Sequence, residues 1–310
     1  MITDSITRSI QKKLGIDLVD ILATKLTGSE LNSLLMKVFA ERAARMSPAE
    51  LLRSYEINRF AQPAETDYIR LLQKSEETLR IFNERGFVPR QVSPLVPLGT
   101  CSVVGVVDQN KIVSATRNGE VLADATNALA LEVASRRKSE GRQATLKFCT
   151  VQRHMRAQTI TVKGFSPHFT IGCLVTAGRD TGSFGFEFST VADHLLTMST
   201  MLKTVFGIDD MHIRLQQRGN YPPEFLDKLA QHLTAELSPM AVDVDRDATE
   251  NTYYHGVQFK VVINKIGRQF EIADGGLVDW TQKLLNDRKE RCCISGFGLE
   301  LLNKMDEGLI

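Results

Sequence analysis

The C-terminal part of the chain constrains the fold most, because three short segments follow one another there. Residues 253–263 open with Tyr-Tyr-His-Gly-Val-Gln-Phe and continue as an apolar, β-branched run. Residues 270–276 end in a glycine pair, and residues 292–302 pass through Gly296 and Gly298 toward a short helix. β-branched runs predict strands, and glycines at strand ends let a ligand approach the main chain. These segments predict a mainly antiparallel sheet with a backbone-lined pocket.

Composition limits the class of protein. A chain of 310 residues with 43% hydrophobic and 24% charged residues is expected to bury a core. The net charge of +1 gives no general attraction to nucleic acid. The five cysteines show no zinc spacing, which favours reduced thiols in a cytoplasmic protein and predicts no metal site. We find no signal peptide and no apolar run near the ~20 residues of a membrane helix, so no membrane contact is expected.

Residues 1–65 are predicted to form an N-terminal helical arm, followed by a core domain over residues 66–310. Apolar side chains recur along the arm at helical spacing, and Ser47-Pro48-Ala49-Glu50 is a capping box with proline at the first helical position. Pro63 breaks the pattern. Such apolar stripes are typical of packing surfaces, and the alternative is a docking arm for a protein partner or a second subunit.

The entry into the core domain predicts a helix and then extended chain. We expect a helix over 66–84, closed by Gly86 as a C-terminal cap, and an extended segment over 87–97. Residues 101–107 and 111–116 are rich in β-forming residues and flank Asp-Gln-Asn, which predicts a hairpin.

Asp124 precedes a helix predicted over 127–137, and two roles are open to it. Its carboxylate could cap that helix, since aspartate is a preferred N-cap residue. It could instead pair with an ammonium group of a ligand, which requires only reach and partial desolvation. The sequence favours neither role over the other.

The remaining elements complete an α+β fold. Strands are predicted at 146–151, 168–175 and 211–215, and helices at 189–206 and 224–236. Adjacent Cys292 and Cys293 are expected to face opposite sides of a strand. We therefore predict a mainly antiparallel sheet flanked by helices, with the helical arm attached.

In their order, the three C-terminal segments resemble the catalytic core of histidyl-tRNA synthetase and its paralogues, which have the class II aminoacyl-tRNA synthetase fold. That family has a Tyr-Tyr-x-Gly-x-x-Phe segment, a glycine pair and a Gly-x-Gly-x-Glu-Arg helix start. Here these correspond to residues 253–259, to Gly275 and Gly276, and to residues 296–301. The resemblance implies the class II fold and a homodimer, and it does not extend to residues 1–65.

The residues at 152–169 resemble the second class II motif, which binds the nucleotide in that family. Arg153, Arg156 and Phe169 match its arginines and its aromatic residue, and Lys163 and Gly164 match its loop. An arginine on a rigid strand can stabilise charge on an α-phosphate, which is the catalytic role that the resemblance implies for Arg153. The alternative is that Arg153 and Arg156 are exposed charges at a strand end. Gly298 and Glu300 of the third motif complete the nucleotide-binding residues implied.

The resemblance also implies an amino-acid pocket. The residues expected to line it are Asp124, Thr126, Tyr253, Tyr254, Gly275 and Gly276. Asp124 and Thr126 match the family's Leu-Arg-Pro-Glu-x-Thr segment, whose glutamate binds the substrate's amino group. Ile171 stands where the family has a glutamine that contacts substrate, so the identity of the ligand, histidine included, stays open.

Three departures count against an ordinary synthetase. Thr249 and Leu301 stand where the family has phosphate-binding arginines, and Met155 replaces a glutamate. Each lost contact to a phosphate would be worth roughly 1.5–3 kcal/mol. The chain given ends shortly after the third motif, so no anticodon-binding domain and no tRNA partner are expected.

Three functions follow from these observations. The first is a synthetase paralogue that binds an amino acid or a similar small molecule without charging tRNA, in a binding or regulatory role. The second is an ATP-dependent ligase that adenylates an amino acid or another carboxylate with ATP and Mg²⁺ and transfers it to an acceptor other than tRNA. The third is a structural homodimer with an inactive pocket.

Overall fold

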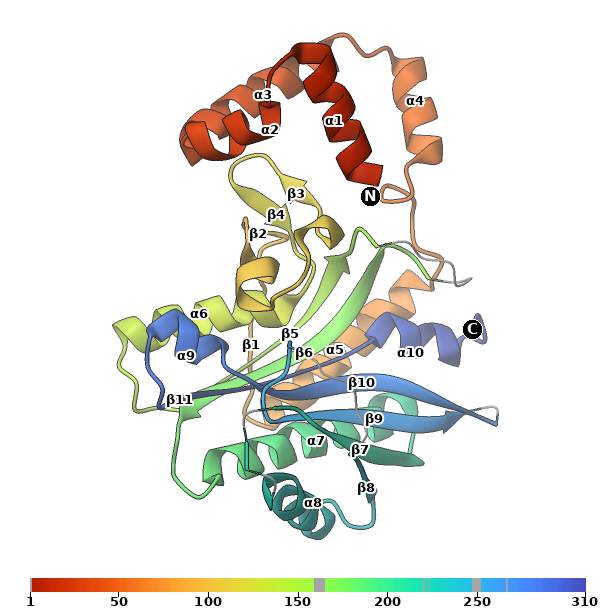
Figure 1. Cartoon of the computed structure of the whole chain (residues 1–310). Coiled ribbons are helices and arrows are strands. Elements are labelled where there is room, and N and C mark those ends of the chain that lie inside the picture. Colours follow the sequence, from red (N-terminus) through yellow and green to blue (C-terminus); the bar gives the residue numbers. More distant parts are fainter. Residues whose placement is uncertain (1, 159–164, 220, 223, 247–251, 266) are drawn as a thin grey trace.

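The core of the molecule is an eight-stranded sheet in the order β1-β5-β6-β11-β10-β9-β7-β8 (Figure 1). The computed structural model describes every residue except 1, 159–164, 220, 223, 247–251 and 266. Only the outer pairs, β1–β5 and β7–β8, are parallel. The strands are β1 Val88–Pro89, β5 Leu146–Met155, β6 His168–Arg179, β7 Met211–Gln217, β8 Ala241–Asp245, β9 Val257–Lys265, β10 Arg268–Val278 and β11 Glu290–Phe297. The mainly antiparallel sheet predicted from sequence is confirmed.

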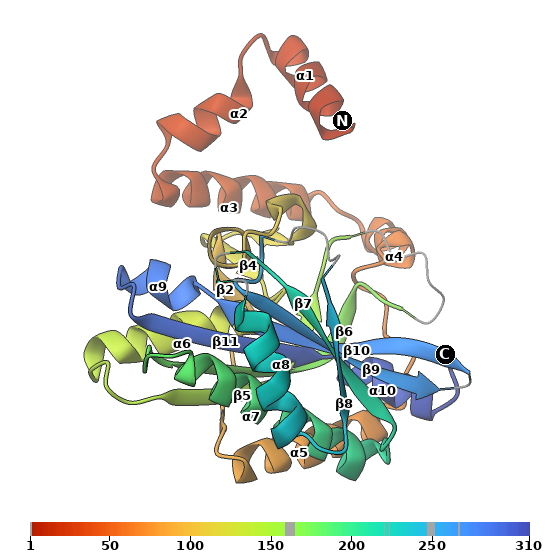
Figure 2. The ribbon, with the colours of Figure 1, turned by 60° about the horizontal axis from the view of Figure 1, so that its bottom comes forward.

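Helices cover both faces of this sheet (Figures 1 and 2). Helices α5 Tyr68–Glu84, α7 Gly185–Phe206, α8 Glu224–Glu236 and α10 Leu299–Asp306 share the larger apolar core with one face. On the other face, α6 Ala125–Ser139 and α9 Trp280–Leu285 contribute to a second core. Cys293 packs in the first core and Cys292 in the second, which confirms the alternation expected for neighbouring strand residues.

The predicted core helices form close to their expected ends. Asp67 caps α5 by accepting a hydrogen bond from the backbone N–H of Arg70, and Gly86 follows the helix with a φ of 83°. Helix α8 has its predicted bounds, and α7 begins at Gly185, before the expected start at Ser189. Local periodicity therefore predicts these helices well.

The hairpin predicted over residues 101–116 is wrong. Residues Thr100–Val104 form a π-helical turn and Gln109–Lys111 a 3₁₀ turn. The hairpin lies further on, between β3 Ser114–Ala115 and β4 Gly119–Val121, and β2 Leu95–Pro97 joins it as a small sheet.

The buried carboxylate of Glu120 explains why the first part of that segment coils. It accepts hydrogen bonds from the backbone N–H groups of Gly99 and Cys101, both 2.9 Å long, and from the side chain of Gln109 at 3.0 Å. A charged group far along the chain thus fixes the backbone of a segment whose β-branched composition favours a strand.

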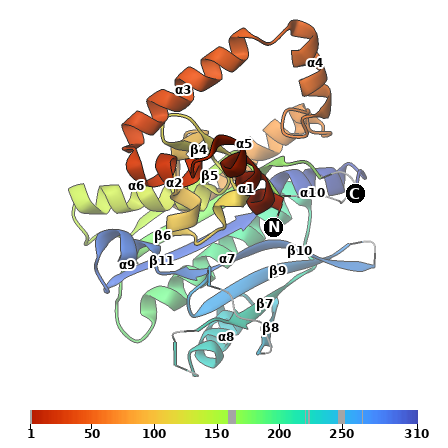
Figure 3. The same ribbon diagram turned by 45° about the horizontal axis from the view of Figure 1, so that its top comes forward.

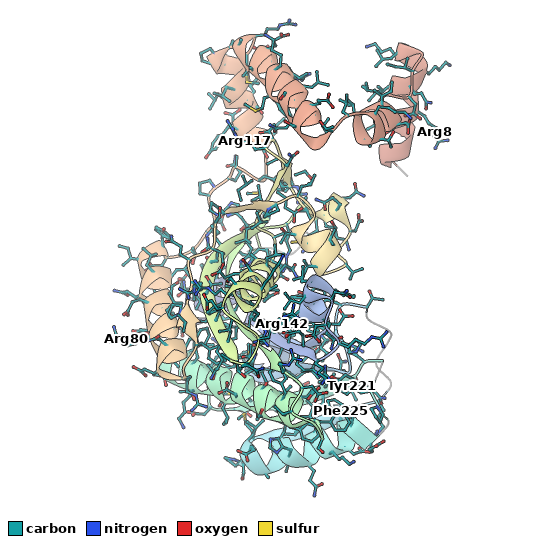
Figure 4. The ribbon with its side chains drawn as sticks, turned by 90° about the vertical axis from the view of Figure 1, so that its left-hand side faces the viewer. Arg8, Arg80, Arg117, Arg142, Tyr221 and Phe225 are labelled. Carbon is teal, nitrogen blue, oxygen red and sulfur yellow. The ribbon has the colours of Figure 1, made fainter. Side chains whose placement is uncertain are left out.

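The N-terminal helices stand apart from the core (Figures 1 and 3). They are α1 Ile2–Leu14, α2 Leu18–Asp20, a π-turn at Ile21–Lys25, α3 Gly28–Ala44 and α4 Pro48–Ile57. The predicted capping box at Ser47 is present, since Ser47 and Glu50 exchange hydrogen bonds. No residue from 5 to 70 is buried. Figure 4 shows Arg117, in the β3–β4 turn, where the small sheet meets the arm, and its backbone N–H donates to the side chain of Asn32.

Candidate functional site

A cavity of about 330 Å³ opens on the face of the sheet that carries α6. Its walls come from β6, β9, β10 and β11, from the Tyr253–Tyr254 segment before β9 and from the N-terminus of α6. The lining residues are Asp124, Thr126, Arg156, Ile171, Cys173, Tyr253, Tyr254, Gln258, Lys260, Glu271, Ile272, Ala273, Asp274, Ile294, Ser295, Gly296, Phe297 and Gly298. This volume lies in the range of small-molecule sites.

Asp124 has the first of the two roles that the sequence left open, that of a helix cap, and its carboxylate also lines the cavity. As the N-cap of α6, it accepts a hydrogen bond from the backbone N–H of Thr126 at 2.9 Å, and the Thr126 hydroxyl donates to the same oxygen at 2.7 Å. The Tyr253 hydroxyl donates to the other oxygen at 2.8 Å. The side chain keeps 20% of its accessible surface and lines the cavity. Three predicted substrate-binding residues therefore meet around one carboxylate.

Tyr254, the fourth predicted side chain, is hydrogen-bonded to an acidic residue that the sequence analysis missed. Its hydroxyl donates to Oδ2 of Asp274 at 2.8 Å, and the Gln258 side-chain amide donates to the same oxygen at 3.1 Å. Asp274 is accessible from the cavity, while protein surrounds its other sides, and this burial raises the pKa of its carboxyl group. Burial also holds the pKa of Tyr253 and of Tyr254 well above the usual range, so both hydroxyls stay protonated donors.

The predicted glycine pair lies inside β10 and not at its end, because the strand continues to Val278. A Cβ atom on Gly275 would lie 2.4 Å from the Phe259 ring, and one on Gly276 would lie 2.2 Å from the Val257 carbonyl oxygen. Both glycines therefore serve close packing within the sheet. Neither is among the described residues that line the cavity, whereas Gly296 and Gly298 are.

Arg156 lies where the first cavity meets a second one of about 250 Å³. Its Nε donates to the Ala123 carbonyl oxygen at 3.1 Å, and its Nη2 is 4.0 Å from Oδ2 of Asp124. Its guanidinium carbon is 5.4 Å from the centroid of the Phe169 ring. Both cavities are lined by Arg156, Ile171 and Gly298. The second cavity is also lined by Phe169, Glu300, Leu301 and Lys304.

Arg153 lines neither cavity and contacts Glu300, which lines the second one. Its side chain donates to Nδ1 of His168 at 2.9 Å, and its Nη1 lies 3.2 Å from Oε2 of Glu300. Strand alternation puts it on the side of Cys149 and Val151, which pack in the core beneath α5 and α10. Neither cavity has it among its described lining residues. Arg153 is thus brought together with Glu300, and Arg156 with Phe169.

His154, next to Arg153, has a structural role that the sequence analysis missed. Its Nε2 accepts a hydrogen bond from the backbone N–H of Ala125 at 2.8 Å, at the first turn of α6, so its Nδ1–H donates to the Gln152 carbonyl oxygen, also at 2.8 Å. Burial lowers the pKa of His154 to about 4. The neutral ring therefore fixes the end of α6 that carries Asp124.

The third motif closes the second cavity. Oε2 of Glu300 accepts from the backbone N–H of Thr170 at 3.1 Å as well as from Arg153, and its Oε1 lies 3.2 Å from Nζ of Lys304. Leu301 contributes an apolar side chain to the lining. Glu300 therefore ties α10 to the β5–β6 hairpin through contacts that are internal to the protein.

Several sequence-predicted positions give no site geometry. Lys163, Gly164 and Thr249 lie outside the described residues. Among the residues that are described, no three His, Cys, Asp or Glu side chains are placed to hold a metal ion. No described helix combines the length and the apolar character needed to cross a membrane.

Comparisons with known proteins identify the fold. The sequence matches no family model and no curated protein. An ATP phosphoribosyltransferase regulatory subunit/histidyl-tRNA synthetase from Bacillus halodurans has a similar structure, with a TM-score of 0.62 and 16% identity over 79% of this chain and 83% of that one. Apo S. aureus histidyl-tRNA synthetase has a TM-score of 0.62 and 12% identity over 81% and 70%.

A third similar structure is a histidine–tRNA ligase subunit from Alicyclobacillus acidocaldarius, with a TM-score of 0.58 and 12% identity over 80% of this chain and 96% of that one. At such identities the similarity establishes the fold alone. This chain has the class II aminoacyl-tRNA synthetase catalytic fold, as the order of the three C-terminal segments predicted.

Proposed function

We propose that this chain binds a small molecule resembling an amino acid in the cavity beside Asp124, and that it has a binding or regulatory role. One observation carries the proposal: a carboxylate that Tyr253 and Thr126 hold in place lies 4.0 Å from the Arg156 guanidinium, and both line the same cavity. A carboxylate and a guanidinium at this spacing suit the ammonium and the carboxylate of a zwitterion. The name of the Bacillus halodurans protein, a regulatory subunit, supports the same role.

Isothermal titration calorimetry with each of the twenty amino acids tests this proposal. We expect binding of at least one of them, and Asp124→Asn should weaken it about tenfold to a hundredfold, because a hydrogen bond to a charged group is worth about 1.5–3 kcal/mol. Asp243→Asn is the matched control, since Asp243 lies on β8 and lines a different cavity. Equal affinity of the two variants, or no binding of any amino acid, would remove the proposal.

An adenylate-forming ligase is the second candidate, and the continuity of the two cavities favours it. Arg156 and Phe169 offer a cation and an aromatic face beside the amino-acid cavity, which suits a nucleotide. ATP would supply the adenylyl group and Mg²⁺ would be held chiefly by its phosphates. Arg153 remains a proposed phosphate ligand only if its side chain leaves Glu300 and His168.

Amino-acid-dependent exchange of pyrophosphate into ATP tests the ligase. If the reaction occurs, Arg156→Ala should abolish it. Comparison with Arg153→Ala then shows which arginine contacts the phosphate. If neither a proteinogenic amino acid nor a ligand found by calorimetry supports exchange, the ligase is ruled out and only the binding function remains.

Partners are a further part of the proposal. The synthetase fold supports a homodimer, and the exposed apolar side chains of the arm, such as Leu34, Phe39 and Leu52, support a protein partner. Light scattering of the full chain at several concentrations would show whether it self-associates.

A further inference from the structure

The charges that line the main cavity do not balance. Glu271 is neutralised, because it lies 2.7 Å from Nζ of Lys260 and 3.1 Å from Arg214. Two carboxylates, Asp124 and Asp274, then share the cavity with one guanidinium, that of Arg156, which lies 4.0 Å from Asp124. Within the part of the chain that the structure describes, no basic side chain lies within 4.0 Å of Asp274.

Asp274 also has hydrogen-bonding capacity directed to the cavity. Tyr254 and Gln258 both donate to its Oδ2, and none of the described residues donates to its Oδ1. Arg218 donates to Oε1 of Gln258 at 2.6 Å, which turns the amide NH₂ of Gln258 toward Asp274. The carboxylate is thus positioned by neutral donors and is accessible, so it can pair with a cationic group of a ligand in the cavity.

The charged groups around Asp274 come from several elements, and Lys111 of the 3₁₀ turn lines an adjoining cavity that Asp274 also borders. Asp124, at the start of α6, repels it and Arg156, after β5, attracts it. Lys260 lies directly opposite Asp274 in the β9–β10 ladder, but its ammonium group pairs with Glu271. Adjacent Tyr253 and Tyr254, whose ring centroids are 4.9 Å apart, donate to Asp124 and Asp274 respectively.

We infer that the ligand of this cavity is a basic amino acid, with its α-ammonium group at Asp124, its carboxylate at Arg156 and a second cationic group at Asp274. The inference rests on the proposed function and specifies its ligand. Apolar lining from Ile171 and Ile294 suits an aliphatic chain between the two cationic groups. Ammonium and guanidinium groups at the end of such a chain could both satisfy Asp274, so the side-chain cation is assigned only by its charge.

Matched ligand pairs test the inference by calorimetry on the full chain at pH 7. Lysine, ornithine and arginine are compared with norleucine, norvaline and citrulline, which keep the α-amino acid part and lose the side-chain charge. We expect at least one basic member to bind about tenfold to a hundredfold more tightly than its neutral partner. Equal affinities within every pair would overturn the inference while leaving the proposed amino-acid site intact.

Substitutions separate the two carboxylates. Asp274→Asn should remove the preference within each pair, whereas Asp124→Asn should weaken both members. Glu271→Gln offers a second test that leaves both carboxylates in place, because a released Lys260 can then pair with Asp274 and should reduce the preference. A preference that survives Asp274→Asn, or no binding of any of the six ligands, would refute the inference, whereas the proposed function falls only if none of the twenty amino acids binds.

Discussion

At the scale of single residues, Asp274 links binding to stability. Its folded-state pKa is raised, so the ionised carboxylate costs free energy in the empty protein at neutral pH. This cost disappears as the pH falls through the raised pKa toward the ordinary aspartate value, because both the folded and the unfolded states then bind the proton.

Asp274→Asn is therefore expected to raise the melting temperature of the ligand-free protein at pH 7 and to have less effect near pH 4. The asparagine keeps an oxygen that accepts from Tyr254, so the hydrogen bond is retained. Calorimetric melting at the two pH values measures the difference. A lower melting temperature at pH 7 would show that the charge is compensated within the protein.

Two buried histidines predict the opposite dependence on pH. Burial lowers the pKa of His154 to about 4 and that of His194 to about 3, whereas both would titrate near 6.5 when unfolded. The unfolded state then binds more protons below pH 6.5, so the folded state loses stability as the pH falls from there toward 4.

Urea unfolding from pH 7 to pH 4.5 would measure this loss. His154→Ala should flatten part of the pH dependence and cost about 1–3 kcal/mol at pH 7, because the buried N–H of Ala125 loses its acceptor. His232→Ala, in a partly exposed ring on α8, is the control and should leave the slope unchanged.

At the scale of elements, a glycine in β10 is needed for close packing, whereas a glycine in β11 lines the cavity. A Cβ on Gly275 meets Phe259 at 2.4 Å and the Ile294 carbonyl oxygen at 2.6 Å. A Cβ on Gly296 finds its nearest neighbour, a methyl group of Ile171, at 3.5 Å, and it projects from a residue that lines the cavity.

Gly275→Ala should therefore destabilise the fold by about 1–3 kcal/mol, the usual cost of overpacking. Gly296→Ala should leave the midpoint of urea unfolding nearly unchanged and weaken ligand binding, because it reduces the cavity. The two effects are measured on the same samples by urea unfolding and by calorimetry. Destabilisation by Gly296→Ala of the same size would contradict this division.

The same elements show what the sequence could predict. Helices α5, α7 and α8 and the β5–β6 hairpin follow from local periodicity and caps, and the order of the C-terminal segments predicts the fold. The side of the sheet on which Arg153 lies could not be predicted from the sequence. Phe148 and Cys149 are both apolar because β5 is buried on both sides, so the hydrophobic pattern of this strand does not alternate. Asp274 and the loop around Glu120 depend on partners distant in sequence.

At the scale of the whole molecule, the arm is attached to the core by few contacts (Figures 1 and 3). The side chain of Arg59 donates to the carbonyl oxygens of Ala157 and Gln158 at 3.1 and 2.6 Å. Nε2 of His168 donates to the Gln62 carbonyl oxygen at 2.6 Å, since its Nδ1 accepts from Arg153. The base of the arm thus contacts the β5–β6 hairpin beside the second cavity.

A chain restricted to residues 66–310 should therefore fold and bind the same ligand. Since no residue from 5 to 70 is buried, the truncation removes little apolar packing from the core. Its cost is limited to a few hydrogen bonds, each worth about 0.5–1.5 kcal/mol. Urea unfolding and ligand titration of the truncated and full chains measure this, with Arg59→Ala in the full chain separating the loss of that anchor from the loss of the helices. A truncated chain without cooperative unfolding would mean that the arm helps to form the core, and that the boundary at residue 65 does not separate two domains.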